Sequence, residues 1–146
     1  MVSKFCKKDD IMIGRYGPPL FVLHRGLEGA YNVAIMKAIP IKIDKMFMWY
    51  FLQNTTLIKY VEAFSIRSAG QSGVNPIILK NYPIFLPSAE EQQIIAAYLD
   101  AKCAQIDSQI AEQESLLAKL ESYKKSLIYE CVTGKREIPA SFADAS

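Results

Sequence analysis

The feature that most constrains this chain is the stretch from residue 88 to residue 138, which contains a single glycine and no proline. Six of the seven prolines lie at or before position 87. Proline interrupts helices and interior glycine weakens them, so their absence favours continuous helix. The stretch predicts one helix from about Ala89 to Thr133, about 65–70 Å long at 1.5 Å per residue.

Both ends of this predicted helix carry recognisable signals. Ser88 and Glu91 form a capping box, in which the Ser88 hydroxyl accepts from the N–H of Glu91 and the Glu91 carboxylate accepts from the N–H of Ser88. Glu90 and Glu91 also suit the positive end of the helix dipole. Gly134 stands where a left-handed residue commonly ends a helix. We therefore expect the helix to begin and end at defined residues.

A seam of ten residues follows the helix in alternating steps of four and three, the spacing of a coiled coil. Eight of the ten are apolar, and Gln113 and Lys124 interrupt them. Polar residues in such a seam weaken it and can set register or partner orientation. One small domain cannot cover so long a seam, so we expect a partner helix from another chain or another subunit. The predicted helix–helix interface consists of Leu99, Cys103, Ile106, Ile110, Gln113, Leu117, Leu120, Lys124, Leu127 and Cys131.

The charge of the chain is divided between two parts. Residues 1–87 carry 11 Lys and Arg against 5 Asp and Glu, a net of +6, while residues 88–146 carry 6 against 10, a net of −4. Twelve aromatic residues precede position 88 and four follow it. A basic, aromatic-rich part joined to an acidic part suggests different partners for each. We predict a domain over residues 1–87, a helix over 88–134 and a tail over 135–146.

Composition excludes several classes of protein. With 51% hydrophobic and 22% charged residues, the chain is typical of a folded globular protein. Its longest apolar run, Met46–Leu52, is far shorter than the about 20 residues of a membrane span, and its first ten residues lack the apolar core of a signal peptide. Three dispersed cysteines and one histidine, His24, indicate no disulfide framework and no zinc site. We expect a cytoplasmic protein without membrane association or catalytic constellation.

The first part predicts a small mixed domain. Short apolar runs between glycine- and proline-rich turns indicate strands. These lie at Asp10–Gly14, at Leu20–Leu23, and once or twice within Ala30–Ile41. The fold class is therefore α+β, a small mixed domain followed by one long coiled-coil-forming helix.

Two helices and a loop complete this part. Asp44 can cap a helix over Lys45–Gln53, which is apolar on all sides and is expected to be buried. Asn54 or Thr55 can cap a second helix that reaches Phe64. The following residues, 65–75, are polar and punctuated by glycine, which predicts a loop.

Candidate DNA contacts gather in this basic part. Arg, Gln and Asn can make bidentate hydrogen bonds to base edges, and Ser can contact phosphates. A solvated loop and ordinary surface residues explain the same residue types. The candidates are Arg15, Tyr16, His24, Arg25, Arg67, Ser68, Gln71, Ser72, Asn75 and Lys80.

Two other motifs have weaker support. Gly14 and Gly17 have the spacing of the loop with which KH domains clamp nucleic acid, but that loop needs a helix on each side, and a strand is predicted before Gly14. Asn75-Pro76-Ile77-Ile78 superficially resembles the Asn-Pro-Pro-aromatic motif of amino-methyltransferases, without the second proline and the aromatic. Ordinary turn glycines explain the first motif, and no glycine-rich cofactor loop precedes the second.

An ordered set of segments resembles the specificity subunits of type I restriction-modification systems. The most specific, Ile84-Phe85-Leu86-Pro87-Ser88-Ala89-Glu90-Glu91-Gln92, is similar to that family's Ile-Pro-Leu-Pro-Pro-x-Glu-Glu-Gln block. The others lie at Asp9–Gly17, Phe47–Leu52, Gly70–Asn75 with Leu79 before a last strand, Tyr123–Ile128 and Val132–Lys135. This chain departs from the family pattern at Asp9, where the family has glycine, and at Ser88, where it has proline.

The resemblance implies a DNA-recognition and scaffold role without chemistry of its own. In such systems the specificity subunit reads double-stranded DNA and docks modification subunits, which use S-adenosylmethionine, and the restriction subunit, which uses ATP, joins through the complex. The resemblance implies no cofactor in this chain, and self-association or pairing with another specificity subunit through the long helix. A recognition domain of about 150 residues would precede that helix, so the chain resembles the second part of one. The alternative is a structural module that associates through its helix and does not read DNA.

Overall fold

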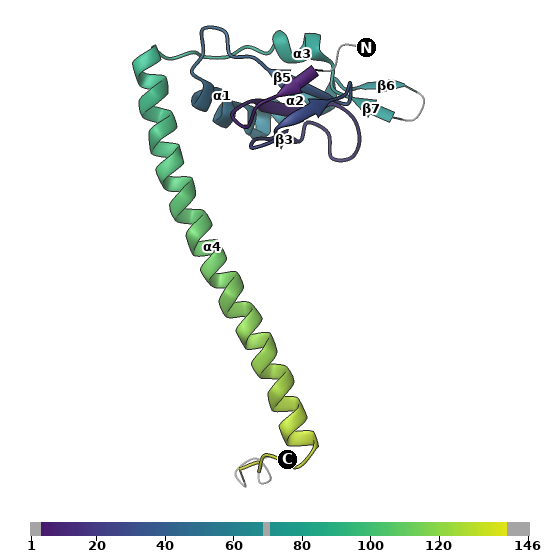
Figure 1. The fold of residues 1–146 in the computed structure, drawn as a ribbon, viewed down its shortest axis with the longest axis vertical. Coiled ribbons are helices and arrows are strands. Elements are labelled where there is room, and N and C mark those ends of the chain that lie inside the picture. The colour runs from purple at the N-terminus through teal and green to yellow at the C-terminus, as the bar shows by residue number, and fades with distance from the viewer. Residues whose placement is uncertain (1–3, 69–70, 140–146) are drawn as a thin grey trace. The chain divides into compact units, whose positions relative to one another are not determined.

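The computed structural model describes residues 4–68 and 71–139, and its fold is α+β (Figure 1). The chain divides into two compact units, one ending at Leu99 and the other beginning at Asp100. The first unit holds the strands and three short helices, and most of one long helix forms the second. The predicted fold class is confirmed.

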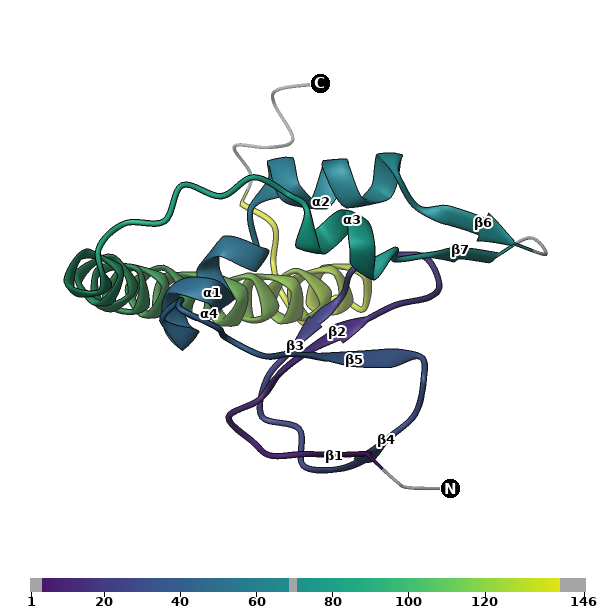
Figure 2. The same ribbon diagram turned by 90° about the horizontal axis from the view of Figure 1, so that it is seen from above.

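The centre of the first unit is β2 (Ile11–Gly14), whose first three residues are all buried. It lies in a three-stranded antiparallel sheet of order β3-β2-β5, between β3 (Leu23–His24) and β5 (Ile35–Ala38). A separate antiparallel pair joins β1 (Lys4–Cys6) to β4 (Gly29–Tyr31) (Figure 2). The strand predicted at residues 10–14 is confirmed, and the one or two strands predicted within 30–41 correspond to β5 and to most of β4.

Helices α1 (Lys45–Leu52) and α2 (Thr55–Ala63) begin where local capping signals place them. The Asp44 carboxylate accepts from the N–H groups of Met46 and Phe47 at 2.8 and 2.9 Å. Asn54 caps α2 in the same way. Both starts were predicted because a cap depends on one side chain and the next two or three amides.

The hydrophobic core forms where these helices pack against β2. It joins alternate residues of β2 to residues of the two helices, to one residue of the loop between β2 and β3, and to the residue that follows β7. Its buried members are Ile11, Ile13, Phe21, Met48, Leu52, Leu57, Val61 and Val74. The expectation that the first helix is buried on all sides is wrong, because only Met48 and Leu52 of α1 are buried and its other side chains are half-buried.

The strand predicted at Leu20–Leu23 is largely absent. Phe21 has a φ of 61°, in the left-handed region that a strand does not use, and its side chain is 3% exposed in the core. Burial of the ring holds this backbone conformation, so only Leu23 of the predicted strand belongs to β3.

The segment predicted as a loop over residues 65–75 contains a hairpin. Strands β6 (Ile66–Ser68) and β7 (Gln71–Gly73) pair antiparallel, while Ala69 and Gly70 lie outside the described residues. A short helix, α3 (Pro76–Lys80), follows where the family resemblance implies a last strand. Proline at the first helical position after an Asn cap favours this helix.

The long helix α4 spans Ala89–Val132, 44 residues, and confirms the prediction to within one residue. The capping box is complete: the Ser88 N–H donates to Glu91 Oε2 at 2.9 Å, and the Glu91 N–H donates to Ser88 Oγ at 3.3 Å. Gly134 has a φ of 69° and ends the helix in a Schellman motif, in which the Lys135 N–H donates to the Glu130 carbonyl at 2.9 Å.

The first turns of α4 belong to the first unit. Gln92 is 3% exposed, its Oε1 accepts from the Asp44 N–H at 2.7 Å, and its Nε2 donates to the Pro87 carbonyl at 2.8 Å. Ala96, one turn further, is also buried. Gln92 therefore ties the start of α4 to the start of α1, a contact that sequence reasoning missed because a lone Gln carries no pattern.

Candidate nucleic-acid interface

The turn after β2 is joined to the β6–β7 hairpin. The Val74 N–H donates to the Arg15 carbonyl at 2.8 Å, and Tyr16 forms an isolated antiparallel bridge with Gly73. On its other side, the Arg15 N–H donates to the Ala34 carbonyl at 2.8 Å. The structure thus brings together residues that lie more than fifty positions apart in the sequence.

Tyr16 packs directly on Gly73. A Cβ atom at position 73 would lie 2.9 Å from Cε1 of the Tyr16 ring, closer than non-bonded atoms normally approach. Glycine at this position therefore lets the ring lie against the hairpin backbone. The second glycine of the Gly70-x-x-Gly73 spacing was the available sequence signal, although the spacing alone did not identify its neighbour.

Arg15 is held at the base of this arrangement. Its Nη1 donates to the Val33 carbonyl at 3.2 Å, and its guanidinium carbon lies 5.1 Å from the centre of the Tyr16 ring. Within the part of the chain that the structure describes, Arg15 Nε is buried and has no hydrogen-bond partner. A cation and an aromatic ring thus lie beside each other next to the hairpin, a combination suited to phosphate and base contacts.

Four further candidates lie on the hairpin itself. Its register places Arg67 opposite Ser72 and Ser68 opposite Gln71. With Arg15 and Tyr16, six of the ten predicted DNA-contact residues therefore come from two joined segments. We call this set, Arg15, Tyr16, Arg67, Ser68, Gln71 and Ser72, the hairpin surface.

His24 and Arg25 lie apart from the Arg15–Tyr16 turn and the hairpin. Strand β3 pairs His24 with Met12, and its antiparallel course leads away from the end of β2 that precedes Arg15. The guanidinium of Arg25 lies 5.3 Å from the centre of the Trp49 ring on α1, in a cation–π arrangement. These two candidates are not part of the hairpin surface.

Asn75 and Lys80 lie at the two ends of α3. Asn75 Oδ1 accepts from the Ile77 N–H at 3.0 Å and caps the helix, so this oxygen has a structural role. Lys80 is exposed at the other end, on the rim of an apolar groove of about 450 Å³ between β5, α1 and α3. The DNA-contact prediction for both residues remains a prediction.

Ion pairs neutralise carboxylates of the first unit. Lys37 Nζ lies 2.7 Å from Asp10 Oδ2, and Lys45 Nζ lies 2.7 Å from Asp9 Oδ2. The hydrogen bond from Lys37 and that from the Lys7 backbone N–H hold the pKa of Asp10 below its ordinary value. The hydrogen bond from Lys45 does the same for the pKa of Asp9. Arg15 takes part in neither of these two ion pairs.

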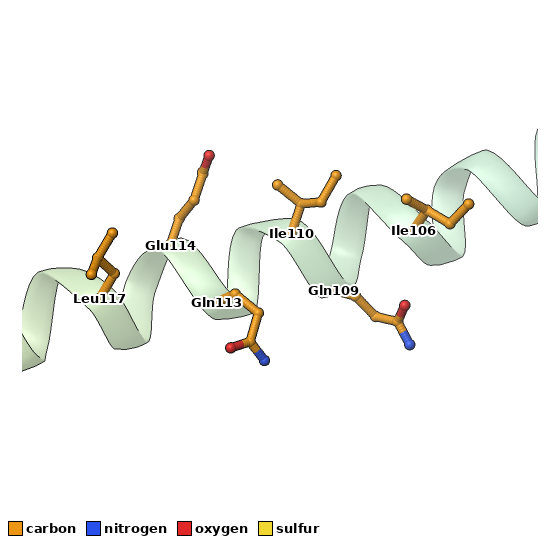
Figure 3. Close-up of a pocket in the computed structure, with 6 residues that line it drawn as sticks. All are labelled: Ile106, Gln109, Ile110, Gln113, Glu114 and Leu117. Carbon is orange, nitrogen blue, oxygen red and sulfur yellow. The ribbon is translucent and has the colours of Figure 1, made fainter.

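The seam of α4 exposes large apolar side chains. Ile106, Ile110, Leu117 and Leu120 are each between 50% and 58% exposed. Figure 3 shows Ile106, Ile110 and Leu117 projecting on one side of the ribbon together with Glu114, and Gln113 on the other. These side chains line one shallow groove along the helix, so α4 exposes an apolar surface, and the predicted helix–helix interface stays a prediction.

The described residues form neither a membrane-spanning helix nor a metal-binding cluster. None of the described helices is both long and apolar enough to cross a membrane. Across residues 4–68 and 71–139, no three His, Cys, Asp or Glu side chains are grouped so that they could hold a metal ion.

These features define an α+β domain, basic in sequence, joined to a long capped helix with an exposed apolar seam. The chain matches the family model of the type I restriction modification DNA specificity domain over residues 4–121, and it belongs to this family. Such a domain is the non-catalytic, specificity part of these systems. No solved structure matches the chain with significance.

Proposed function

We propose that this chain recognises double-stranded DNA as a specificity component of a type I restriction-modification complex and positions the modification subunits on it. Within the division at residues 1–87, 88–134 and 135–146, the first part reads DNA and the helix serves assembly. Modification subunits bring S-adenosylmethionine, the restriction subunit brings ATP, and this chain binds neither. The complex works in the cytoplasm.

The observation that carries this proposal is the joining of the Arg15–Tyr16 turn to the β6–β7 hairpin. The Arg15–Val74 hydrogen bond and the Tyr16–Gly73 contact hold both segments together. The hairpin surface combines two Arg, one Gln, two Ser and one Tyr, residue types that contact phosphates and base edges. Family membership supports the class of ligand.

Substitution of hairpin residues tests the proposal. In a complex reconstituted with modification subunits, we expect Arg67→Ala and Gln71→Ala each to weaken binding to the target duplex by about 1–3 kcal/mol, because a bidentate base contact is worth that much. Binding is measured by fluorescence anisotropy with target and scrambled duplexes over a range of salt concentrations, since phosphate contacts make affinity fall with salt.

Lys59→Ala and Gln93→Ala are the matched controls. Both residues are exposed, Lys59 on α2 and Gln93 on α4, and neither belongs to the hairpin surface. We expect their affinities and salt slopes to equal those of the unmutated complex. Unchanged affinity and target preference in both hairpin variants would remove the hairpin surface from the DNA interface.

The exposed seam of α4 favours a second candidate function. On this alternative, the chain is a structural module that dimerises or pairs with another specificity subunit through α4 and does not contact DNA. Leu117→Asp and Leu120→Asp would then abolish assembly, because a charge at a packed seam position is unfavourable. Two results together would favour this alternative: both leucine variants lose assembly, and substitutions across the hairpin surface leave the DNA affinity unchanged.

A further inference from the structure

We propose that the outer edge of β5 and the apolar groove beside it bind an extended segment of a partner protein as an added β-strand. The segment carries apolar side chains at alternate positions and a carboxylate close to one end. Neither Arg15 nor Tyr16 of the hairpin surface is among the described residues that line this groove. The inference therefore concerns a second surface, and it does not depend on DNA binding.

The outer edge of β5 carries backbone groups that point away from the sheet. The Arg15 N–H donates to the Ala34 carbonyl at 2.8 Å, so Ala34 faces β2. Successive residues of a strand direct their N–H and C=O groups to opposite sides. The N–H and C=O of Lys37, and the N–H of Ile39 just beyond the strand, therefore face outward. Among residues 4–68 and 71–139, no strand pairs with this edge.

The apolar groove opens along the same edge. Met36 and Ala38, whose side chains lie on the core face of β5, line the groove together with Lys37, whose side chain lies on the other face. A groove that reaches both faces of one strand lies at the edge of that strand. Its floor reaches the core, because Met48 and Leu52 of α1 line it and are only 8% and 5% exposed. An occupant would therefore extend the core of the first unit.

The edge and the groove together select an extended occupant. A strand residue opposite Lys37 would exchange main-chain hydrogen bonds with it, and the residues before and after would point their side chains into the groove. A helix bonds its own backbone groups and would leave the edge without partners. The apolar residues of the occupant must therefore stand at alternate positions.

The wall of the groove is exposed apolar surface. Ile39 and Ile41 line it and are 69% and 77% exposed, and Ile84 is 37% exposed. Exposed apolar patches mark interaction sites in soluble proteins, and an open strand edge is a template for pairing with another chain. Since the lining is mostly aliphatic and aromatic, the ligand is a protein segment and not a nucleic acid.

Charge at the groove supplies the remaining property of the occupant. A lysine on an edge strand ordinarily discourages pairing, but Lys37 Nζ is held 2.7 Å from Asp10 Oδ2. Lys80 lines the rim, Lys42 stands between two lining residues, and both are exposed. Neither takes part in the ion pairs of the described residues. A carboxylate on the occupant complements these two cations.

A synthetic peptide tests the proposal on the full chain. The probe is the fluorescein-labelled peptide Thr-Val-Thr-Val-Thr-Val-Ser-Glu, whose valines stand at alternate positions. We expect saturable binding in fluorescence anisotropy. Methylation of the backbone nitrogens of the second and third threonines removes hydrogen-bond donors without changing a side chain, and it should raise the dissociation constant about tenfold or more.

Two further measurements locate the binding site. Bound peptide should slow hydrogen exchange of the Lys37 and Ile39 amides, followed by NMR, because both then donate to the added strand. Ile41→Asp should raise the dissociation constant about tenfold, since it places a carboxylate on the apolar wall. Val33→Asp is the matched control, because Val33 is 72% exposed and is not among the described lining residues, and it should leave the dissociation constant unchanged.

Three results would overturn the proposal. Equal affinity of the methylated and unmethylated peptides would replace strand addition with a purely apolar contact. Absence of peptide binding to the full chain would remove the edge of β5 as a binding site. Protection of the Lys37 amide that grows with protein concentration, without peptide, would identify a second copy as the occupant in place of a partner protein.

Discussion

Gln92 is a buried polar residue whose side chain joins two segments of the first unit. Its amide satisfies two backbone groups from different segments, the N–H of Asp44 and the carbonyl of Pro87. It is also the last residue of the Ile84–Gln92 block that resembles the family pattern. The buried amide gives that block a physical role, because it holds the beginning of α4 to the N-terminus of α1.

We expect Gln92→Ala to lower the free energy of unfolding by about 2 kcal/mol, since two backbone groups lose their partners in a buried place. Gln93→Ala is the matched control, because Gln93 is its exposed neighbour on the same helix, and it should change the free energy by less than about 0.5 kcal/mol. Urea unfolding followed by tryptophan fluorescence measures both. Equal stability of the two variants would show that the Gln92 hydrogen bonds are not formed in solution.

The Asp10–Lys37 ion pair makes a pH-dependent contribution to stability. The pKa of Asp10 in the folded chain lies below its unfolded value of about 4. Ionised Asp10 therefore stabilises the fold above about pH 4, and this stabilisation is lost as the pH falls through the lower, folded pKa. We expect Asp10→Asn to lower the melting temperature at pH 7 and the difference to shrink steadily as the pH falls below about 4.

Glu62→Gln, at an exposed carboxylate on α2, should have little effect on the melting temperature at either pH. A constant difference between Asp10→Asn and the unmutated chain from pH 7 to pH 2 would contradict the ionic origin of the effect.

At the scale of elements, capped helices were predictable and the hairpin was not. Asp44, Asn54 and the Ser88–Glu91 box act on amides within three residues, so the sequence carries the whole signal. The β6–β7 hairpin contacts Tyr16, which is more than fifty residues away in the sequence, and the hairpin's own residues show no apolar alternation. The backbone conformation at Phe21 was not predictable either, because its ring packs in the core with residues distant in the sequence.

The same distinction applies to the candidate sites. The seam positions of α4 follow from helical periodicity, and the structure places large apolar side chains there in exposed positions. The ten candidate DNA contacts were chosen by residue type, which says nothing about proximity. The structure joins six of them on two segments and leaves His24, Arg25, Asn75 and Lys80 in other places.

At the scale of the whole molecule, a near-neutral chain combines two parts with opposite charge. The net of +6 over residues 1–87 suits a polyanionic ligand, and ion pairs such as Asp9–Lys45 and Asp10–Lys37 occupy carboxylates that would otherwise oppose it. The net of −4 over residues 88–146 disfavours binding of a polyanion to that part of the chain. Under the proposed function, this division of charge assigns DNA recognition to the first part of the chain and assembly to the second.

The anchoring of only the first turns of α4 has a consequence for how fast its amide protons exchange with solvent. Amides near Gln92 and Ala96 can exchange only when the first unit opens, whereas those between Asp107 and Leu120 can exchange by local opening of a helical segment whose side chains are exposed among the described residues. We expect hydrogen–deuterium exchange followed by mass spectrometry to divide this one continuous helix into a slow class and a fast class at low protein concentration. The fast class should slow as concentration rises and seams pair, and uniform exchange along α4 at every concentration would contradict both statements.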